Sequence, residues 1–146
     1  MRNLTCLMLG AILALGAAAA GKVLLGGSAR AETPKKRRVV AWSEGKAPKE
    51  IYPKDVNGAV AEGLKPLAGW EVVTASFEDP EQGCSQESLD RTDVMLWFGH
   101  AVHHLVKDEY VDRIVRRVKE GGMGFISLHS SHFAKPYVKL MGTSCD

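Results

Sequence analysis

The sequence predicts an α/β protein in which a parallel sheet is covered by helices on both faces. Short apolar segments of strand length alternate four times with segments whose apolar residues repeat at helical spacing. This order with short connections is typical of parallel sheets, because each helix returns the chain to start the next strand in the same direction. The composition, 45% apolar and 25% charged, is that of a globular protein, and 146 residues allow at most one domain.

The N-terminal 31 residues have a different character and predict a secretory signal peptide. A positive charge precedes an uncharged apolar run over residues 4–20, and Ala29 and Ala31 form a small-x-small cleavage signal before Glu32. A membrane anchor is one alternative, although the run is short for a full span, and cleavage after Ala20 is another. We therefore expect an exported protein, in the periplasm or outside the cell.

Removal of this segment makes the chain nearly neutral. Without Arg2, Lys22 and Arg30, the 19 basic residues become 16 against 17 acidic ones. Residues 32–37 then form a basic lead-in to the first strand. No basic surface and no aromatic interleaving follow the lead-in, so nucleic acid is not an expected partner.

Two of the three cysteines remain in the exported chain. Cys6 lies in the signal, whereas Cys84 and Cys145 stay and could pair in an oxidising compartment. Their spacing is not that of metal ligands.

The domain, residues 38–146, begins with two strands and a helix between them. Strands are predicted over 38–42 and 70–76. Apolar residues over 56–67 recur at helical spacing, with Asp55 as the N-cap. A long loop follows the second strand and contains one helical turn over 86–90.

The second half repeats this order. The continuous apolar run 94–98 predicts a strand that is buried on both faces, in the centre of the sheet. Asp108 can cap an amphipathic helix that ends at Gly121 and Gly122, and a fourth strand follows over 124–128.

A last helix starts at Ser130 or Ser131 and closes at Gly142. Doubly wound sheets usually have more than four strands, so we expect a domain that is incomplete at its C-terminus.

The candidate functional residues lie just after the strands, because ligands of open parallel sheets bind beyond the carboxyl ends of the strands. All five histidines occupy the loops after the third and fourth strands. Neighbouring strands are about 4.8 Å apart, so His100 and His129 should emerge side by side, with His132 one turn along. With Glu44 they could bind Zn²⁺ or a similar divalent metal. The alternative is a metal-free set that hydrogen-bonds a polar ligand.

Further residues at these strand ends are candidates for substrate binding. His103 and Ser130 follow the third and fourth strands, and Trp97 either stacks on a sugar ring or belongs to the core. A serine nucleophile at Ser130 or Ser131 is not expected, because the glycines that a nucleophile elbow needs are missing. These serines are better explained as helix caps.

Several motifs, in order along the chain, resemble those of ThuA-like (trehalose-utilisation) proteins. They are Tyr52-Pro53 ahead of Asn57-Gly58-Ala59, Asp79-Pro80-Glu81, and the segments 93–100, 128–133 and 140–145. The resemblance covers about residues 39–146. It implies the flavodoxin-like fold of the class I glutamine amidotransferase-like superfamily, and a role in sugar utilisation beside a partner sugar dehydrogenase. The implied ligand is trehalose, a related disaccharide or a keto-sugar.

The resemblance also bears on the active residues. His100, His103, His129 and His132 match the family's histidine positions, whereas His104 stands where an acidic residue is expected. Amidotransferases place a cysteine in the elbow after a central strand, and here that place is taken by His129-Ser130-Ser131, so glutaminase chemistry is not expected. Family members continue for roughly another hundred residues, in line with a domain of ordinary size.

Three functional hypotheses follow from the sequence. The first is a sugar-modifying enzyme of hydrolase, lyase or isomerase type, in which His100, His129 and His132 are catalytic and Glu44, Trp97, His103 and Ser130 bind substrate. The second is a module that binds a sugar or a partner without catalysis. The third is an inactive fragment.

Overall fold

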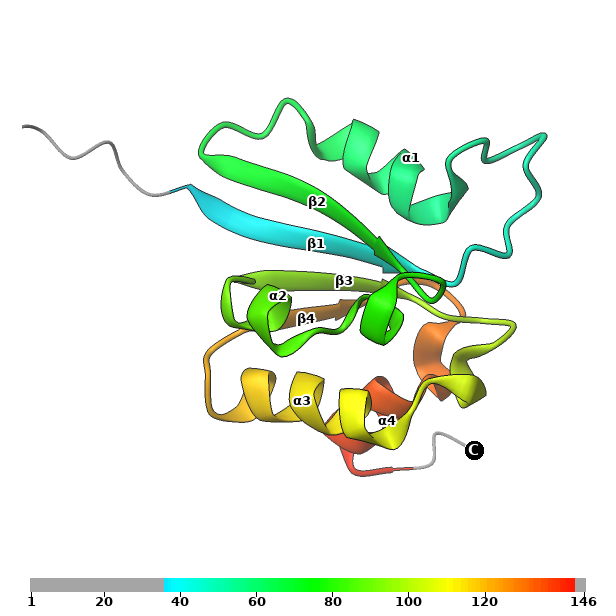
Figure 1. The fold of residues 1–146 in the computed structure, drawn as a ribbon. Coiled ribbons are helices and arrows are strands. Elements are labelled where there is room, and N and C mark those ends of the chain that lie inside the picture. The colour runs from blue at the N-terminus through cyan, green and yellow to red at the C-terminus, as the bar shows by residue number, and fades with distance from the viewer. Residues whose placement is uncertain (1–35, 144–146) are drawn as a thin grey trace, which may run out of the picture. The chain divides into compact units, whose positions relative to one another are not determined.

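The computed structural model of the protein describes residues 36–143. The predicted signal peptide, most of the basic lead-in and Cys145 lie outside these residues. The described part is an α/β unit in which strands and helices alternate along the chain (Figure 1). None of its helices is long and apolar enough to cross a membrane.

The sheet consists of four parallel strands in the order β2-β1-β3-β4. They are β1 (Arg37–Ser43), β2 (Trp70–Ser76), β3 (Val94–Phe98) and β4 (Gly124–Ser127). All four predicted strands are confirmed, and β3 occupies a central position as predicted. The chain moves from β1 outward to β2 and then back past β1 to β3, so the direction of winding reverses between β1 and β3. This pair is the switch point of the sheet.

Helices cover both faces of the sheet, which confirms the predicted fold class (Figure 1). One face carries α1 (Asp55–Leu64), and the other carries α2 (Gln86–Asp90), α3 (Asp108–Lys119) and α4 (Lys135–Met141). Three short 3₁₀ turns complete the unit: η1 (Pro80–Gly83), η2 (His103–Leu105) and η3 (Ser131–Phe133). The predicted last helix is thus divided into η3 and α4, and α4 ends at Gly142 with φ 71°.

The start of α1 differs from the prediction. Asp55 is the first helical residue rather than the N-cap, and its φ is 62°. Its carboxylate accepts a hydrogen bond from the Ser43 hydroxyl at the end of β1, so it holds the preceding loop as well as the helix. The helix ends at Leu64, and the buried part of its surface is formed by Asp55, Asn57 and Gly58. The Asn57 amide donates to a backbone carbonyl of β2 at 2.8 Å.

The hydrophobic core lies between the sheet and the helices α2 to α4. Because successive strand residues point to opposite faces, Trp42 and Trp97 both point to this side, where α3 contributes Ile114. The two indole rings stack across β1 and β3, with centroids 3.6 Å apart and planes at 6°. Burial of a large apolar side chain contributes about 1.5–3 kcal/mol, so this pair is a major stabilising contact between the central strands.

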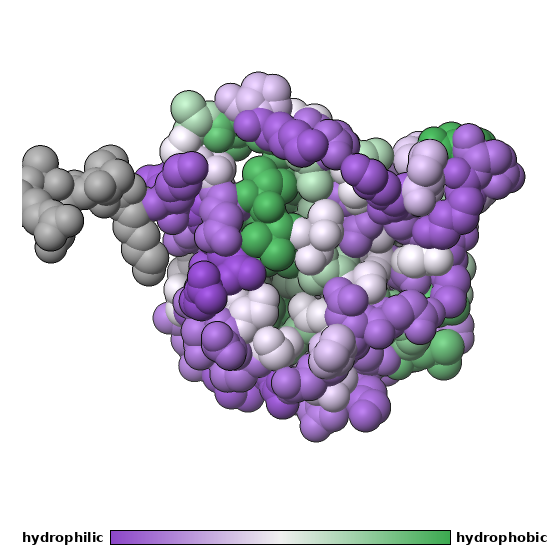
Figure 2. All heavy atoms as spheres, turned by 45° about the horizontal axis from the view of Figure 1, so that its top comes forward, coloured by the Kyte–Doolittle hydropathy of each residue, from purple (hydrophilic) through white to green (hydrophobic). Residues whose placement is uncertain are grey.

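The other face of the sheet is only partly covered. Beside α1, apolar side chains line a hollow of about 300 Å³, which we name the apolar hollow. Its lining is Val39, Leu64, Leu67, Trp70, Val94, Leu96 and Ile126. Figure 2 shows hydrophobic side chains gathered on this face below α1, with hydrophilic side chains around them.

Candidate functional site

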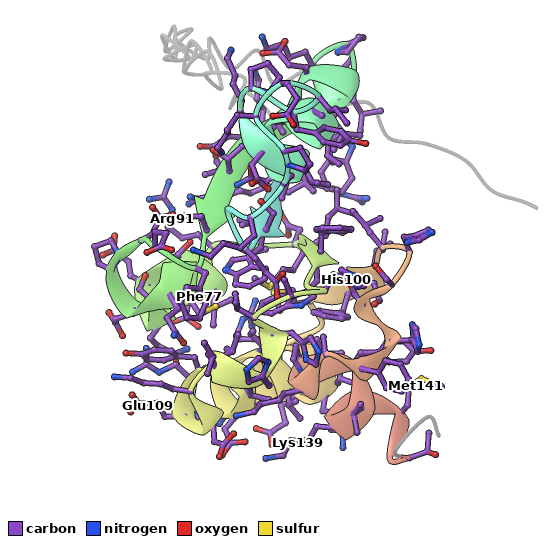
Figure 3. All side chains as sticks on the ribbon, turned by 90° about the vertical axis from the view of Figure 1, so that its right-hand side faces the viewer. Phe77, Arg91, His100, Glu109, Lys139 and Met141 are labelled. Carbon is purple, nitrogen blue, oxygen red and sulfur yellow. The ribbon has the colours of Figure 1, made fainter. Side chains whose placement is uncertain are left out.

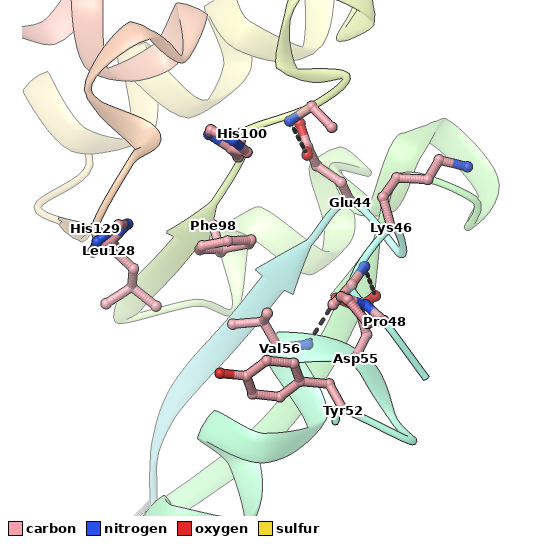
Figure 4. Close-up of a pocket in the computed structure, with 12 residues that line it drawn as sticks. Glu44, Lys46, Pro48, Tyr52, Asp55, Val56, Phe98, His100, Leu128 and His129 are labelled. Carbon is pink, nitrogen blue, oxygen red and sulfur yellow. Dashed lines mark hydrogen bonds between the residues drawn. The ribbon is translucent and has the colours of Figure 1, made fainter. Parts of the chain in front are cut away.

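A pocket of about 540 Å³ opens at the carboxyl ends of β1 and β3. Its walls come from the loop after β1, the start of α1, and the loops after β3 and β4 (Figure 4). This is the switch point of the sheet, where open α/β sheets bind their ligands. The volume falls within the range of about 300–1,000 Å³ that is usual for small-molecule sites.

The pocket brings together His100 and His129, from the loops after the neighbouring strands β3 and β4. Both residues are exposed. Figure 3 views the molecule from the carboxyl ends of the strands and shows His100 between α1 and the pair α3 and α4.

His129 has a φ of 46°, in the left-handed region that non-glycine residues rarely adopt. Such a conformation costs on the order of 1–3 kcal/mol and persists only where the surrounding structure enforces it. The residue before His129 is still bonded to the sheet, because the Leu128 N–H donates to the Trp97 carbonyl of β3. The turn from β4 into η3 therefore presents an imidazole where a nucleophile elbow presents its reactive group.

The other three histidines are not part of the pocket lining. His132 is exposed, and its ring packs against Phe133 with centroids 4.0 Å apart. The pocket lining includes His100 and His129 but not His132, which lies on η3. His104 is exposed on η2.

His103 is half-buried on η2, and its Nδ1 has no hydrogen-bond partner within residues 36–143. Burial lowers the pKa of His103, and the nearby charge of Glu44 only partly opposes this effect. The imidazole is therefore neutral at neutral pH.

Glu44 borders the pocket, but both of its carboxylate oxygens already accept hydrogen bonds. The Ala101 N–H donates to Oε2 at 2.7 Å and the Val102 N–H donates to Oε1 at 2.9 Å. The residue is only 2% exposed. Its carboxylate thus binds the backbone of the loop after β3 instead of standing free for a ligand.

Asp55 is a second buried carboxylate at the pocket, and from sequence it was predicted only as a helix cap. Its Oδ1 accepts from the Ser43 hydroxyl and from the Val56 N–H, both at 2.7 Å, and its Oδ2 accepts from the Ala47 N–H at 3.1 Å. Burial would raise the pKa of Asp55, but these hydrogen bonds and the Lys49 ammonium at 3.7 Å outweigh it and hold the pKa below its ordinary value. Asp55 is therefore ionised at neutral pH.

The apolar walls of the pocket come from Tyr52, Val56, Phe98 and Leu128 (Figure 4). Phe98 was not among the site residues predicted from sequence, whereas its neighbour Trp97 was. Trp97 is 0% exposed within the core, so its ring face is not available to a ligand. The two residues differ because adjacent strand residues point to opposite faces of the sheet. For Tyr52 the only signal was its place in a family-like motif.

The serines after β4 have a role that differs from the predicted helix capping. Ser131 is fully buried; its Oγ accepts from the Gly99 N–H at 2.8 Å and donates to the Trp97 carbonyl at 3.2 Å. Ser130 precedes η3, is half-buried and makes no side-chain cap hydrogen bond. A fully buried hydroxyl that makes two hydrogen bonds is not available as a nucleophile.

The described residues contain no group of three or more His, Cys, Asp or Glu side chains that is arranged to hold a metal ion. His100 and His129 supply two imidazoles to the pocket, while the carboxylates of Glu44 and Asp55 are engaged in hydrogen bonds. A catalytic zinc site usually has three protein ligands. The pocket lining offers two imidazoles, fewer than this number of ligands, and Zn²⁺ binding stays a prediction.

Comparison with protein-family models and with curated protein sequences finds no match to this chain. The resemblance to ThuA-like proteins therefore depends on the motifs in the sequence alone.

Proposed function

We propose that this chain is a ThuA-like protein of carbohydrate utilisation that acts on a sugar or keto-sugar in the pocket at the switch point. The observation that carries this proposal is the pairing of His100 and His129 at one pocket, with His129 in a strained backbone conformation. Strained residues cluster at functional sites, because elsewhere nothing favours keeping them.

The chemistry of the pocket suits a sugar. A sugar ring has an apolar C–H face and a rim of hydroxyl groups, and the pocket offers both kinds of surface. Tyr52 and Phe98 provide aromatic faces, while His100 and His129 can each donate or accept a hydrogen bond.

The two imidazoles are the groups that we assign to proton transfer. A neutral histidine can accept a proton from a hydroxyl group, or from a carbon beside a keto group, and return it in the next step. Glu44 and Asp55 are less suited to this role because backbone N–H groups already occupy their oxygens. Cys84 is buried in the core and burial raises its pKa to about 12, so it offers no thiolate for glutaminase-type chemistry.

A binding module without catalysis is the second candidate function. It is favoured by the same engaged carboxylates, since neither is free to orient an imidazole or to stabilise its charged form. The two functions share the pocket and differ only in turnover.

The test is to incubate the purified chain with trehalose and with a keto-disaccharide, and to follow binding by calorimetry and conversion by proton NMR. We expect His100→Ala and His129→Ala each to weaken binding at least about tenfold, which corresponds to about 1.4 kcal/mol. His104→Ala is the matched control, because His104 is exposed and lies outside the pocket lining. Binding without conversion would support the module, and binding that both histidine variants leave unchanged would refute the site.

The proposed setting is outside the cytoplasm, after removal of residues 1–31, beside a sugar dehydrogenase that forms the keto-sugar. The supporting features are the apolar N-terminal run with its cleavage signal and the family-like motifs.

A further inference from the structure

The loop that carries His100 is held by side chains from other parts of the sheet. On one side of His100, the carboxylate of Glu44 accepts the N–H groups of Ala101 and Val102. Glu44 directly follows β1, so these bonds fix the loop after β3 to the neighbouring strand. Charge-assisted hydrogen bonds of this kind are short and are strengthened by burial, and Glu44 is almost fully buried.

On the other side of His100, the Ser131 hydroxyl bonds both the N–H of Gly99 and the carbonyl of Trp97. Ser131 lies two residues after His129, in the turn after β4. One buried hydroxyl therefore ties the turn that carries His129 to the loop that carries His100.

The loop also passes through a space that only glycine fits. A β-carbon at Gly99 would lie 2.8 Å from Trp97 Nε1 and 3.2 Å from His103 Cβ. With Gly99, Ala101 and Val102 all bonded through their N–H groups, His100 is flanked on both sides by fixed backbone while its own side chain lines the pocket.

We propose that Glu44 and Ser131 are positioning residues, which clamp loop 99–102 from β1 and from the turn after β4 and so hold His100 beside His129. The inference rests on the proposed function, in which both imidazoles act on one ligand. The imidazoles touch the ligand, whereas Glu44 and Ser131 act through them.

The test compares Glu44→Gln and Ser131→Ala with two matched controls in the full-length chain. Ser127→Ala removes a hydroxyl whose oxygen is buried without a hydrogen-bond partner in the described residues, and Glu50→Gln removes an exposed charge from the loop after β1. Nitrogen-15 relaxation reports the order of the His100 amide, hydrogen exchange reports the amides of Gly99, Ala101 and Val102, and calorimetry reports trehalose affinity.

In the unaltered chain we expect a His100 order parameter of about 0.85, and in both clamp variants a value below about 0.6. Hydrogen exchange of the Gly99 amide should accelerate at least about tenfold in Ser131→Ala. Exchange of the Ala101 or Val102 amide should accelerate by a similar factor in Glu44→Gln. The reason is that loss of one hydrogen bond raises the equilibrium constant for local opening of the loop about tenfold. Trehalose affinity should fall at least about tenfold in both variants. Hydrogen exchange of the strand amides should stay unchanged. The controls should match the unaltered chain in all three measurements.

Failure of this inference is separable from failure of the proposed function. If His100→Ala weakens trehalose binding but neither clamp variant does, the clamp is refuted and the function stands. If trehalose does not bind, the proposed function fails, and the relaxation data still test the clamp. A mobile His100 amide in the unaltered chain, or a rigid His100 amide in both clamp variants, overturns the clamp. Should one variant fail to fold, the other and the unaltered chain give the same decision.

Discussion

At the scale of single residues, Asp55 combines a buried carboxylate with a left-handed backbone. Its oxygens accept hydrogen bonds from Ser43 at the end of β1, from Ala47 in the following loop and from Val56 in α1. One side chain therefore connects three consecutive parts of the chain along one wall of the pocket. Such a carboxylate stabilises the fold in its ionised form.

We predict that Asp55→Asn destabilises the protein by about 1–3 kcal/mol at pH 7, because a buried acceptor of several hydrogen bonds is lost. Since the folded-state pKa of Asp55 is lowered, its contribution is fully present above the unfolded value of about 3.9 and is lost as the pH falls through the lower, folded-state pKa. Urea unfolding at a series of pH values measures both effects. Glu71→Gln, at an exposed position on β2, is the control, and equal acid sensitivity of Asp55→Asn and the unaltered protein would contradict the prediction.

Cys84 is predicted to be inert rather than catalytic. It is 0% exposed, and burial raises its pKa to about 12, so the thiolate that reacts with alkylating agents is scarce at pH 8. We expect iodoacetamide to modify Cys84 in the native protein at least about a hundredfold more slowly than in urea, as judged by mass spectrometry. Cys84→Ser should leave sugar binding unchanged, and rapid native alkylation would show that the thiol is accessible.

The residues of the site could be located from sequence only to within a strand end. His100 and His129 were predicted because they lie within two residues of the ends of strands. The sequence does not tell which of Trp97 and Phe98 faces the core and which faces the pocket, because an unbroken apolar run has no alternation from which to read the phase of the strand. The hydrogen bonds of Glu44 could not be predicted either, since their donors lie 57 and 58 positions away along the chain.

At the scale of elements, helical periodicity predicted α3, and short apolar segments bounded by turn residues predicted all four strands, with nearly correct ends. The prediction was poorer where local signals and tertiary contacts disagree. Apolar spacing extended α1 to Leu67, but the helix ends at Leu64 and Leu67 lies in the connection to β2. Asp55 resembles an N-cap in sequence, but it is the first residue of the helix, and its carboxylate accepts a hydrogen bond from the Ala47 N–H in the loop after β1. Contacts from distant residues decide such boundaries.

The turn between β4 and η3 stores backbone strain at His129, which leads to a prediction with two opposite effects. Glycine tolerates a positive φ, so His129→Gly should raise the free energy of unfolding by up to about 1 kcal/mol, less the entropy that glycine adds to the unfolded chain. The same variant should abolish trehalose binding. Thermal unfolding and calorimetry measure the two effects, with His132→Gly as the control because His132 lies outside the strained position and the pocket. A marked loss of stability in His129→Gly would show that the imidazole itself supports the fold.

At the scale of the whole molecule, the described unit has an open edge and an incompletely covered face. β4 pairs only with β3 within residues 36–143, and it carries no charged residue that would discourage further pairing. Ile126 on this strand is 48% exposed and lines the apolar hollow. Exposed apolar surface next to an unprotected strand edge favours self-association.

We predict that the purified chain scatters light increasingly with concentration and that Ile126→Lys raises the onset concentration severalfold, because a charge then lies at the edge and beside the hollow. Met141→Lys introduces the same charge at another exposed apolar position, at the end of α4, and should have little effect. Equal shifts in both variants would indicate a general effect of net charge.

The N-terminal segment leads to a prediction about the exported chain. If residues 1–31 act as a signal peptide, N-terminal sequencing of material recovered outside the cytoplasm should begin at Glu32. Exported material that keeps residues 4–20 would indicate an anchor instead.

The stacked indoles of Trp42 and Trp97 make the central strands optically visible. Two indole rings with centroids 3.6 Å apart couple their electronic transitions, and this coupling should contribute a signal of its own to the circular dichroism spectrum. That signal depends on the registry of β1 against β3 and not on helix content. Since the loop that bears His100 begins two residues after Trp97, a ligand that shifts this loop could be followed by the same spectrum without any added label.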